Sequence, residues 1–330
     1  MDIDGKNILI TGGTGSFGKK FVNFVLANYS PRRLVVFSRD ELKQEEMREY
    51  LPDKAGHPIR YFIGDIRDKE RLYRAFAGVD LVVHAAALKQ VPTAEYNPLE
   101  VIKTNILGAA NIIDAAIDCK VARVIALSSD KAVNPVNLYG GTKLCADKLF
   151  VAAGVYSGSG KSQFSVVRYG NVVGSRGSVI PGFLKQRQSG VLKLTDERMT
   201  RFWITLEQSV AFVVNSIMRM RGGEIFVPKL PSMRLMDLAK AVAPECRIEF
   251  IGIRPGEKLH ETLISEDEAR RTIEHEDYFV VRPHSMYDFS SEEIGHADNQ
   301  VVRDFQYISN DNSSWLSIDE LRTIVEKFGF

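Results

Sequence analysis

The sequence has no excess of charge of either sign. Its 330 residues include 43 lysines and arginines and 42 aspartates and glutamates, which gives a formal net charge of +1. A chain this close to neutrality offers no broad electrostatic surface for nucleic acid or for an anionic membrane. We therefore expect neither as a partner, although local arginines and lysines can still bind a small anion.

Cysteines and long apolar runs are also scarce. Cys119, Cys145 and Cys246 lie far apart and match no metal-binding or redox spacing. We therefore expect no metal site and structural thiols, with Cys145 packed in the interior. No apolar run approaches the about 20 residues of a membrane span, and residues 6–11 lead into a glycine loop without a signal peptide. The sequence thus predicts a cytoplasmic protein.

The order of the apolar segments favours an α/β fold. With 45% hydrophobic residues, the chain can bury a full core. Strand and helix signals alternate as far as Tyr169 and become mixed beyond it, without a sharp boundary. We predict a Rossmann-type doubly wound parallel sheet in residues 1–170. A smaller, mixed substrate-binding region, intertwined with the first, should occupy residues 171–330.

A glycine-rich turn follows the first predicted strand, residues 7–11. Glycines recur every three residues in this turn, and a helix-like run follows it. In that context they permit a tight turn, a close approach of the backbone to a pyrophosphate and close helix-to-strand packing. The turn therefore predicts a dinucleotide site. The expected cofactor contacts are Gly12, Thr14, Gly15, Ser16, Phe17 and Gly18.

The end of the second predicted strand bears on the choice between NAD and NADP. An acidic residue there would bind the ribose hydroxyls of NAD, but Ser38 and Arg39 occupy the place, with Lys43 one helical turn on. Arginine pairs bidentately with phosphate and suits the 2′-phosphate of NADP, so we expect NADP. The alternative is a solvated Arg39 with Asp40 as a helix N-cap or turned toward a ribose.

Two further strand ends complete the predicted cofactor wall. Asp65 and Ile66 follow the third strand, where they could contact the adenine amino group and cover its ring, although Asp65 could equally be a turn residue. The fourth strand, residues 81–87, ends in three small residues, and we expect Ala86 to contact the cofactor. His84 within that strand is expected to be a core histidine, because no carboxylate partner is evident.

The densest chemistry lies in residues 123–143. Residues 124–127 read as a buried parallel strand, and Ser129, Asp130 and Lys131 follow at its carboxyl end. Open α/β sheets bind their ligands at that edge. We therefore predict that these three side chains belong to an active site.

A tyrosine and a lysine follow on the next predicted helix. The helix should begin near Leu138 and carry Tyr139 and Lys143 on one face, because residues four apart are helical neighbours. A nearby ammonium favours the phenolate and lowers a phenol pKa that is about 10 when unperturbed. Asn105, in a long helix predicted over residues 99–117, could support that lysine.

Polar residues farther along are candidates for binding a substrate. The glycine-rich loop at residues 170–178 carries Asn171, Ser175 and Arg176. Three more charged residues lie far apart in the sequence, so they can bind one ligand only if the fold brings them together. Taken one at a time, such residues are more often surface charges. They are Arg201, Arg254 and Glu257.

The glycine turn together with Tyr139-x-x-x-Lys143 and Ser129 resembles the extended short-chain dehydrogenase/reductase superfamily. More narrowly, six segments resemble the inverting UDP-N-acetylglucosamine 4,6-dehydratases, hydro-lyases that begin pseudaminic acid synthesis. These segments are Ser-Arg-Asp-Glu-Leu-Lys-Gln (38–44), His-Ala-Ala-Ala-Leu-Lys-Gln-Val (84–91), Ser-Ser-Asp-Lys-Ala (128–132), Arg-Tyr-Gly-Asn-Val (168–172), Met-Thr-Arg-Phe (199–202) and Arg-Pro-Gly-Glu-Lys (254–258).

The resemblance implies a role for each residue of the central stretch. Tyr139 would take the proton of the sugar 4-hydroxyl while hydride passes to NADP, with Ser129 and Lys143 assisting. Lys131 would be the base at C5 and Asp130 would serve the elimination of the 6-hydroxyl, giving an L-configured 6-deoxy-4-keto sugar. Lys131 can be a base only if burial or neighbouring lysines lower its pKa, which is about 10.4 when free.

The same resemblance implies UDP-N-acetylglucosamine as substrate and a homo-oligomer, either a dimer or a larger assembly such as a hexamer. It leaves open whether the product serves flagellin glycosylation or a capsule. The resemblance also implies that Arg201 and Arg254 bind the UDP diphosphate, that Glu257 binds the ribose and that Lys89 contacts the sugar. Two alternatives stand beside it: an epimerase or reductase of the same superfamily, and a non-catalytic NADP-sensing regulator. The implied substrate ligands are Lys89, Asn171, Arg201, Arg254 and Glu257.

Overall fold

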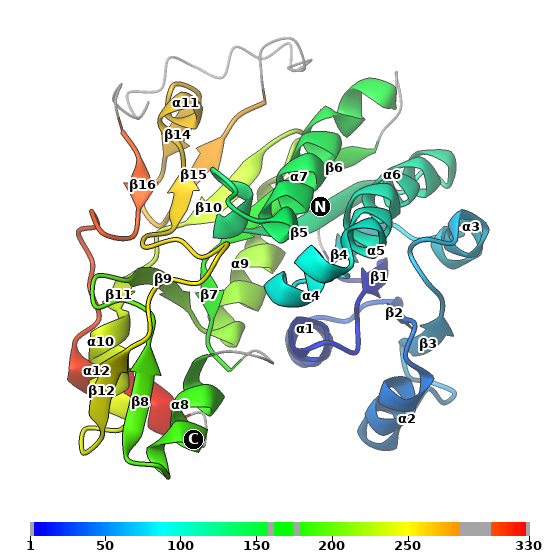
Figure 1. The fold of residues 1–330 in the computed structure, drawn as a ribbon. Coiled ribbons are helices and arrows are strands. Elements are labelled where there is room, and N and C mark those ends of the chain that lie inside the picture. The colour runs from blue at the N-terminus through cyan, green and yellow to red at the C-terminus, as the bar shows by residue number, and fades with distance from the viewer. Residues whose placement is uncertain (1–2, 158–161, 175–178, 284–304, 328–330) are drawn as a thin grey trace.

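A computed structural model of the chain describes residues 3–157, 162–174, 179–283 and 305–327. The candidate loop residues Ser175 and Arg176 lie outside these described residues. Within them, nine strands form the main sheet, in the order β14-β15-β10-β6-β5-β4-β1-β2-β3 (Figure 1). The bounds are β1 Asn7–Thr11, β2 Arg33–Ser38, β3 Ile59–Ile63, β4 Leu81–His84, β5 Arg123–Ser129, β6 Gln163–Tyr169, β10 Ile225–Pro228, β14 Thr272–Glu274 and β15 Tyr278–Val281.

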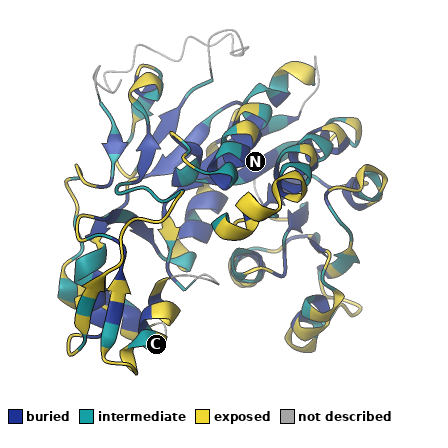
Figure 2. Ribbon diagram, in the orientation of Figure 1, coloured by how far each residue is buried: buried dark blue, intermediate teal, exposed yellow. Residues whose placement is uncertain are grey.

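The strands from β3 across to β10 pair in parallel, and β15 and β14 add an antiparallel edge. Most of their apolar residues are buried, as in a sheet covered on both faces, with Ile63 on the edge strand β3 as an exposed exception (Figure 2). Helices α3, α6 and α7 pack together, and α1 packs against α9. The predicted doubly wound fold is therefore confirmed. These helices are α1 Ser16–Asn28, α3 Lys69–Phe76, α6 Gly108–Asp118, α7 Leu138–Tyr156 and α9 Leu206–Arg219.

After the short helix α4, the chain is helical without a break from residue 98 to residue 118. This confirms the long helix predicted over residues 99–117, although its middle forms a π-helical turn. Because five residues here form a π-helical turn, Asn105 turns toward the loop after β4. Its amide accepts a hydrogen bond from Leu88 N (2.8 Å) and donates to Leu88 O (2.9 Å) and Thr142 Oγ1 (3.0 Å). Asn105 thus ties this loop to α7, and its predicted support of Lys143 is not what these contacts show. The elements are α4 Val91–Tyr96, α5 Pro98–Ile102 and the π-turn η1 Lys103–Leu107.

A second, smaller core lies in the later half of the chain, at the lower left of Figure 1. It combines a three-stranded sheet, β11-β9-β7, with a two-stranded sheet, β12-β8, and with α8, α10 and α12. The elements are β7 Asn171–Val172, α8 Val179–Arg187, β8 Val191–Leu194, β9 Thr200–Ile204, β11 Ser232–Arg234, α10 Leu235–Val242, β12 Arg247–Phe250 and α12 Ile318–Lys327.

The same half of the chain also returns to the main sheet, through β10, β14 and β15. A further pair of strands, β13 (Thr262–Ile264) and β16 (Tyr307–Ile308), lies beside it, with the short helix α11 (Glu266–Ala269). The two parts are therefore interwoven along the chain. The division at residue 170 into cofactor and substrate regions stays a prediction.

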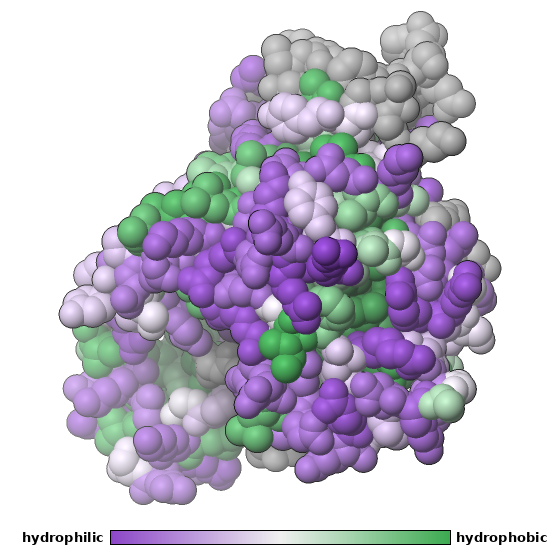
Figure 3. Space-filling model, turned by 90° about the vertical axis from the view of Figure 1, so that its right-hand side faces the viewer, coloured by the Kyte–Doolittle hydropathy of each residue, from purple (hydrophilic) through white to green (hydrophobic). Residues whose placement is uncertain are grey.

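The surface is mostly hydrophilic, with apolar side chains in scattered groups on the face drawn in Figure 3. Among the described residues, no helix is both long and apolar enough to cross a membrane. Cys145 is exposed on α7, so its predicted packing in the interior is wrong: it lies on the outer side of a helix whose other side holds Tyr139 and Lys143. Cys119 and Cys246 are partly buried.

Candidate active site

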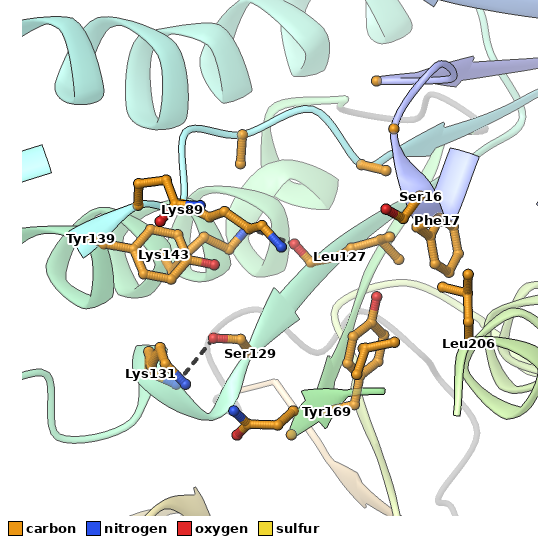
Figure 4. A pocket seen from close by; sticks show the side chains of 18 of the residues that line it. Ser16, Phe17, Lys89, Leu127, Ser129, Lys131, Tyr139, Lys143, Tyr169 and Leu206 are labelled. Atoms are coloured by element: carbon orange, nitrogen blue, oxygen red, sulfur yellow. Dashed lines mark hydrogen bonds between the residues drawn. The ribbon is translucent and has the colours of Figure 1, made fainter. Parts of the chain in front are cut away.

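A cavity of about 970 Å³ follows the carboxyl edge of the main sheet and extends toward the smaller core. Apart from Ser175 and Arg176, which lie outside the described residues, every catalytic, cofactor and substrate position predicted from the sequence lines this cavity. In Figure 4, Tyr139 and Lys143 project from α7 near Ser129 and Lys131, which lie at the end of β5. The fold thus brings together residues from position 12 to position 257 of the chain.

The glycine turn after β1 has the shape that a dinucleotide requires. Gly12 has a φ of +66°, and a Cβ there would lie 3.0 Å from the backbone of Ala86. A Cβ at Gly18 would lie 2.5 Å from the backbone of Gly13. Helix α1 then begins at Ser16, and no side chain caps its first turn. Its backbone N–H groups therefore remain available for a phosphate, so the turn fits a pyrophosphate.

The end of the cavity beside β2 carries two basic side chains and two engaged carboxylates. The carboxylate of Asp40 caps helix α2 (Glu41–Tyr50) by accepting from Lys43 N at 3.0 Å, and it also pairs with the Lys43 ammonium. This confirms the N-cap that was the alternative interpretation of Asp40. Arg39 is half exposed and lies 3.4 Å from Asp65, which Arg67 also holds at 2.7 Å. Burial raises the pKa of Asp65, but Arg67 and Arg39 lower this pKa by a larger amount, so the carboxylate stays ionised.

His84 is a buried core histidine, as predicted. Its Nδ1 lies 2.8 Å from Thr11 Oγ1, which links β4 to β1. Burial and the neighbouring Lys143 ammonium lower the pKa of His84 to about 3. The ring is therefore neutral at ordinary pH and supports the sheet rather than serving as an acid or base.

The tyrosine and the lysine occupy the inner face of α7. The helix begins at Leu138, as predicted, because the side chain of Asn137 caps it by accepting from Gly140 N at 2.8 Å. Both side chains are buried, and Lys143 Nζ donates to Leu127 O at 2.5 Å. Helical spacing thus fixes Tyr139 and Lys143 beside the end of β5.

The electrostatics of this pair differ from the prediction. Burial raises the pKa of Tyr139, while Lys131 and a hydrogen bond with Ser129 oppose the rise without cancelling it. Burial lowers the pKa of Lys143, and Asp147 opposes that change. The expected lowering of the Tyr139 pKa by Lys143 is therefore wrong for this structure, because Lys131 is the cation that acts on the phenol most strongly.

The buried Asp130 and the partly buried Lys131 form an ion pair on a short 3-10 turn, η2 (Asp130–Ala132), at the end of β5. Ser129 Oγ accepts from Lys131 N at 3.1 Å, the dashed line in Figure 4. Lys131 Nζ lies 3.0 Å from Asp130 Oδ1 and 3.5 Å from Glu261 Oε1. The turn therefore presents one ammonium between two carboxylates.

The predicted lowering of the Lys131 pKa is also wrong. Burial does lower it, but Asp130 and Glu261 raise it by more, so the pKa of Lys131 lies above its ordinary value. Burial raises the pKa of Asp130 against the opposing effect of Lys131. Lys131 is thus an ammonium in the resting site, beside a carboxylate that takes up a proton more readily than usual.

Glu261 was missed by the sequence analysis. It precedes β13 in an irregular stretch, so no periodicity marks it, and it lies 130 positions beyond Lys131. It is 3% exposed and pairs with Lys131, with Arg201 at 3.7 Å and with Lys258 at 3.8 Å. A charged residue beside the matched segment 254–258 was the only available signal.

The predicted substrate residues that line the cavity differ in how far their side chains already form hydrogen bonds within the protein. Arg201 directs its guanidinium at backbone carbonyls, among them Thr200 O at 2.7 Å and Leu259 O at 3.0 Å. Arg254 is exposed and starts a turn in which its N–H donates to Glu257 Oε2 at 3.4 Å. Burial and Lys131 lower the pKa of Lys89. The sequence did not predict the apolar cavity lining that the smaller core supplies, which consists of Val173, Ile180, Phe183, Trp203 and Leu235 among others.

Sequence comparison relates most of the chain to known proteins. The model of a family described as "Polysaccharide biosynthesis protein" matches residues 8–283. A Campylobacter jejuni protein named UDP-N-acetylglucosamine 4,6-dehydratase (inverting) is 54% identical over 329 residues, covering 98% of each chain. A Rickettsia conorii protein named UDP-glucose 4-epimerase is 40% identical, covering 97% of this chain and 95% of the relative.

Solved structures share the fold. Pen from Bacillus thuringiensis superimposes with a TM-score of 0.88 at 38% identity, covering 99% of this chain and 100% of the other. DesIV, a dTDP-glucose 4,6-dehydratase from Streptomyces venezuelae with NAD and TYD bound, has a TM-score of 0.67 at 22% identity, covering 77% and 86%. At that identity the second likeness concerns the fold alone.

Proposed function

The chain belongs to the polysaccharide biosynthesis protein family, and from this membership we propose that it is a sugar-nucleotide 4,6-dehydratase that inverts C5 of UDP-N-acetylglucosamine. One observation carries the proposal: the ion pair of the buried Asp130 with Lys131 shares a cavity with Tyr139 and Lys143. The first pair provides acid–base groups for an elimination, and the second provides groups for oxidising an alcohol.

The cavity supports a nicotinamide dinucleotide as the cofactor. The glycine turn keeps the tight shape that suits a pyrophosphate only because Gly12 and Gly18 lack a Cβ, which would collide with the backbone of Ala86 and of Gly13. Arg39 and Lys43 at the end of β2 favour the 2′-phosphate of NADP. The bound nicotinamide would take hydride from C4 of the sugar and return it at C6.

Because burial raises the pKa of Tyr139, the phenol must first give up its own proton, and the neighbouring Lys143, whose pKa burial lowers, is the group proposed to accept it. The Tyr139 phenolate, hydrogen-bonded to Ser129, then removes the proton of the sugar 4-hydroxyl. The ketone that results at C4 makes the hydrogen at C5 acidic. Because Lys131 rests as an ammonium, it must first pass its proton to Asp130, whose pKa burial raises. Lys131 then takes the C5 proton, and Asp130 gives its proton to the departing 6-hydroxyl, which leaves as water. Return of a proton to the opposite face of C5 gives the L-configuration.

The predicted substrate contacts complete the proposal. Arg254 and Arg201 would serve the diphosphate, Glu257 the ribose, Asn171 the nucleotide and Lys89 the sugar, all from the wall of the cavity. Among the two arginines, Arg254 is the stronger candidate, because backbone carbonyls already engage Arg201. A homo-oligomeric, cytoplasmic enzyme that opens pseudaminic acid synthesis remains our expectation from the family resemblance.

A 4-epimerase is the competing function, because Rickettsia relatives of 39 to 43% identity carry the name UDP-glucose 4-epimerase. An epimerase needs Tyr139 and Lys143 but no acid–base pair that removes a 6-hydroxyl. The ion pair of Asp130 and Lys131 in the cavity favours the dehydratase.

The test is to incubate the purified protein and NADP with UDP-N-acetylglucosamine in deuterium oxide and to analyse the product by NMR. The expected product is a 6-deoxy-4-keto sugar of L-configuration that carries deuterium at C5. A product with an intact 6-hydroxyl and an inverted C4 would show an epimerase. Cofactor binding without turnover of any UDP-sugar would instead favour the regulator.

A further inference from the structure

The carboxylate of Glu261 lies behind the catalytic pair and has no step of its own in the proposed reaction. Its segment is already anchored through the backbone: Glu261 N donates to Ser309 Oγ at 2.9 Å, and Ser309 N donates to Glu261 O at 2.9 Å. Nearby, Lys258 Nζ donates to Val133 O at 2.6 Å, which ties the segment to η2. The position of this stretch therefore does not depend on the Glu261 carboxylate.

The contacts of that carboxylate are with charges. Lys131, Arg201 and Lys258 lie 3.5 to 3.8 Å from it, and Oε2 is buried without a hydrogen-bond partner among the described residues. Burial raises the pKa of Glu261, but these three cations lower it by more, so the carboxylate stays ionised. A charge that is buried at such cost and makes few hydrogen bonds acts mainly through its field.

We propose that Glu261 is a positioning residue whose negative charge keeps one proton on the Asp130–Lys131 pair, so that the pair enters the elimination with a proton to give. This inference rests on the proposed function. The charge acts on both members, because it stabilises the Lys131 ammonium at 3.5 Å and disfavours a second carboxylate at Asp130. Consistent with this, Glu261 raises the pKa of both groups.

The retained proton matches the chemistry of the elimination. One proton leaves C5 for Lys131, and one leaves Asp130 for the departing hydroxide, so the pair holds one proton before and after the step. Four further titratable groups interact electrostatically with Asp130 or Lys131. They are Arg201, Lys89, Lys258 and Tyr139. The three cations among them favour loss of the proton, and Glu261 opposes them.

The test compares the pH dependence of kcat for dehydration in the wild-type holoenzyme and in Glu261→Gln. Removing a charge within about 4–6 Å shifts a pKa by about one to three units. The alkaline limb of kcat should therefore fall at a pH about one to three units lower in the variant. Glu261→Asp, which keeps the charge, should retain a limb close to wild type. A uniform loss of rate with an unmoved limb would overturn the proposal.

A matched control is Glu268→Gln. Glu268 is also mostly buried and also pairs with an arginine, Arg168 at 2.9 Å, but it acts on neither Asp130 nor Lys131. Its variant should lose thermal stability and keep the alkaline limb of the wild type. An equal shift in both variants would show a general effect of losing a buried carboxylate and would also contradict the proposal.

If Glu261→Gln does not fold, Glu261→Met replaces it, because methionine is uncharged and similar in length. Its alkaline limb should also fall at lower pH, and an unmoved limb would overturn the proposal. Two different outcomes would refute the proposed function and the role of Glu261. Absence of any 6-deoxy product from the wild-type protein would refute the proposed function, whereas normal turnover with coincident pH profiles would refute only the role of Glu261.

Discussion

The two halves of the candidate active site differ in what governs their protonation. On the hydride side, Tyr139 and Lys143 lie on one helix beside the end of β5, and burial is the largest influence on both pKa values. On the elimination side, Lys131 is only partly buried, and the charges of Asp130 and Glu261 together overturn the effect of burial on its pKa. Burial thus sets the direction of the pKa shifts of Tyr139, Lys143 and Asp130, whereas neighbouring charges set that of Lys131, the proposed base at C5.

This difference separates the general chemistry from the specific chemistry. A buried tyrosine and lysine at helical spacing suffice to oxidise a sugar alcohol with a bound dinucleotide. Removing water and inverting C5 needs, in addition, a proton that is held in the right place, which requires opposite charges close together in a low-dielectric site. Variants on each side can test whether the two sides really act separately.

The largest effect is expected for Lys131→Ala. Losing a general acid–base group costs about 10²- to 10⁴-fold in rate, and formation of the 6-deoxy product should fall by that amount. Binding of UDP-N-acetylglucosamine, measured by calorimetry, should stay close to wild type. If binding fell as much as the rate, Lys131 would be a substrate ligand, and the elimination side would lose its assigned base.

A smaller effect is expected for Arg39→Ala, at the far end of the cavity from the chemistry. A hydrogen-bonded charge pair contributes about 1.5–3 kcal/mol, so the affinity for NADP should fall about tenfold or more. The affinity for NAD should change little. Fluorescence titration with each dinucleotide measures both, and an equal loss for the two would show that Arg39 does not read the 2′-phosphate.

Most of the hydride side could be predicted from the sequence, because its rules are local. The glycine turn needs only its own spacing and the strand before it, and the start of α7 at Leu138 follows from Asn137 as a cap and from the i, i+4 spacing of Tyr139 and Lys143. These positions lie where the pattern placed them.

The elimination side was predictable only in part. Asp130 and Lys131 were found from their place after a strand, but the direction of the Lys131 pKa was wrong because Glu261 comes from a distant, aperiodic segment. The π-helical turn at Asn105 escaped prediction for a related reason: its amide is satisfied by a loop and a helix that tertiary packing brings to it. Contacts of long sequence separation leave no periodic signal.

The most direct measurement supplies the 6-deoxy-4-keto product to the NADP-loaded enzyme in deuterium oxide and follows deuterium entry at C5 by NMR. That exchange needs the elimination side but no hydride transfer. In Tyr139→Phe, dehydration should fall about 10²- to 10⁴-fold while C5 exchange stays within a factor of about three of wild type. In Lys131→Ala, both should be lost. If Tyr139→Phe abolished C5 exchange as completely as Lys131→Ala, the hydride and elimination sides would act as one unit, which would contradict their separation.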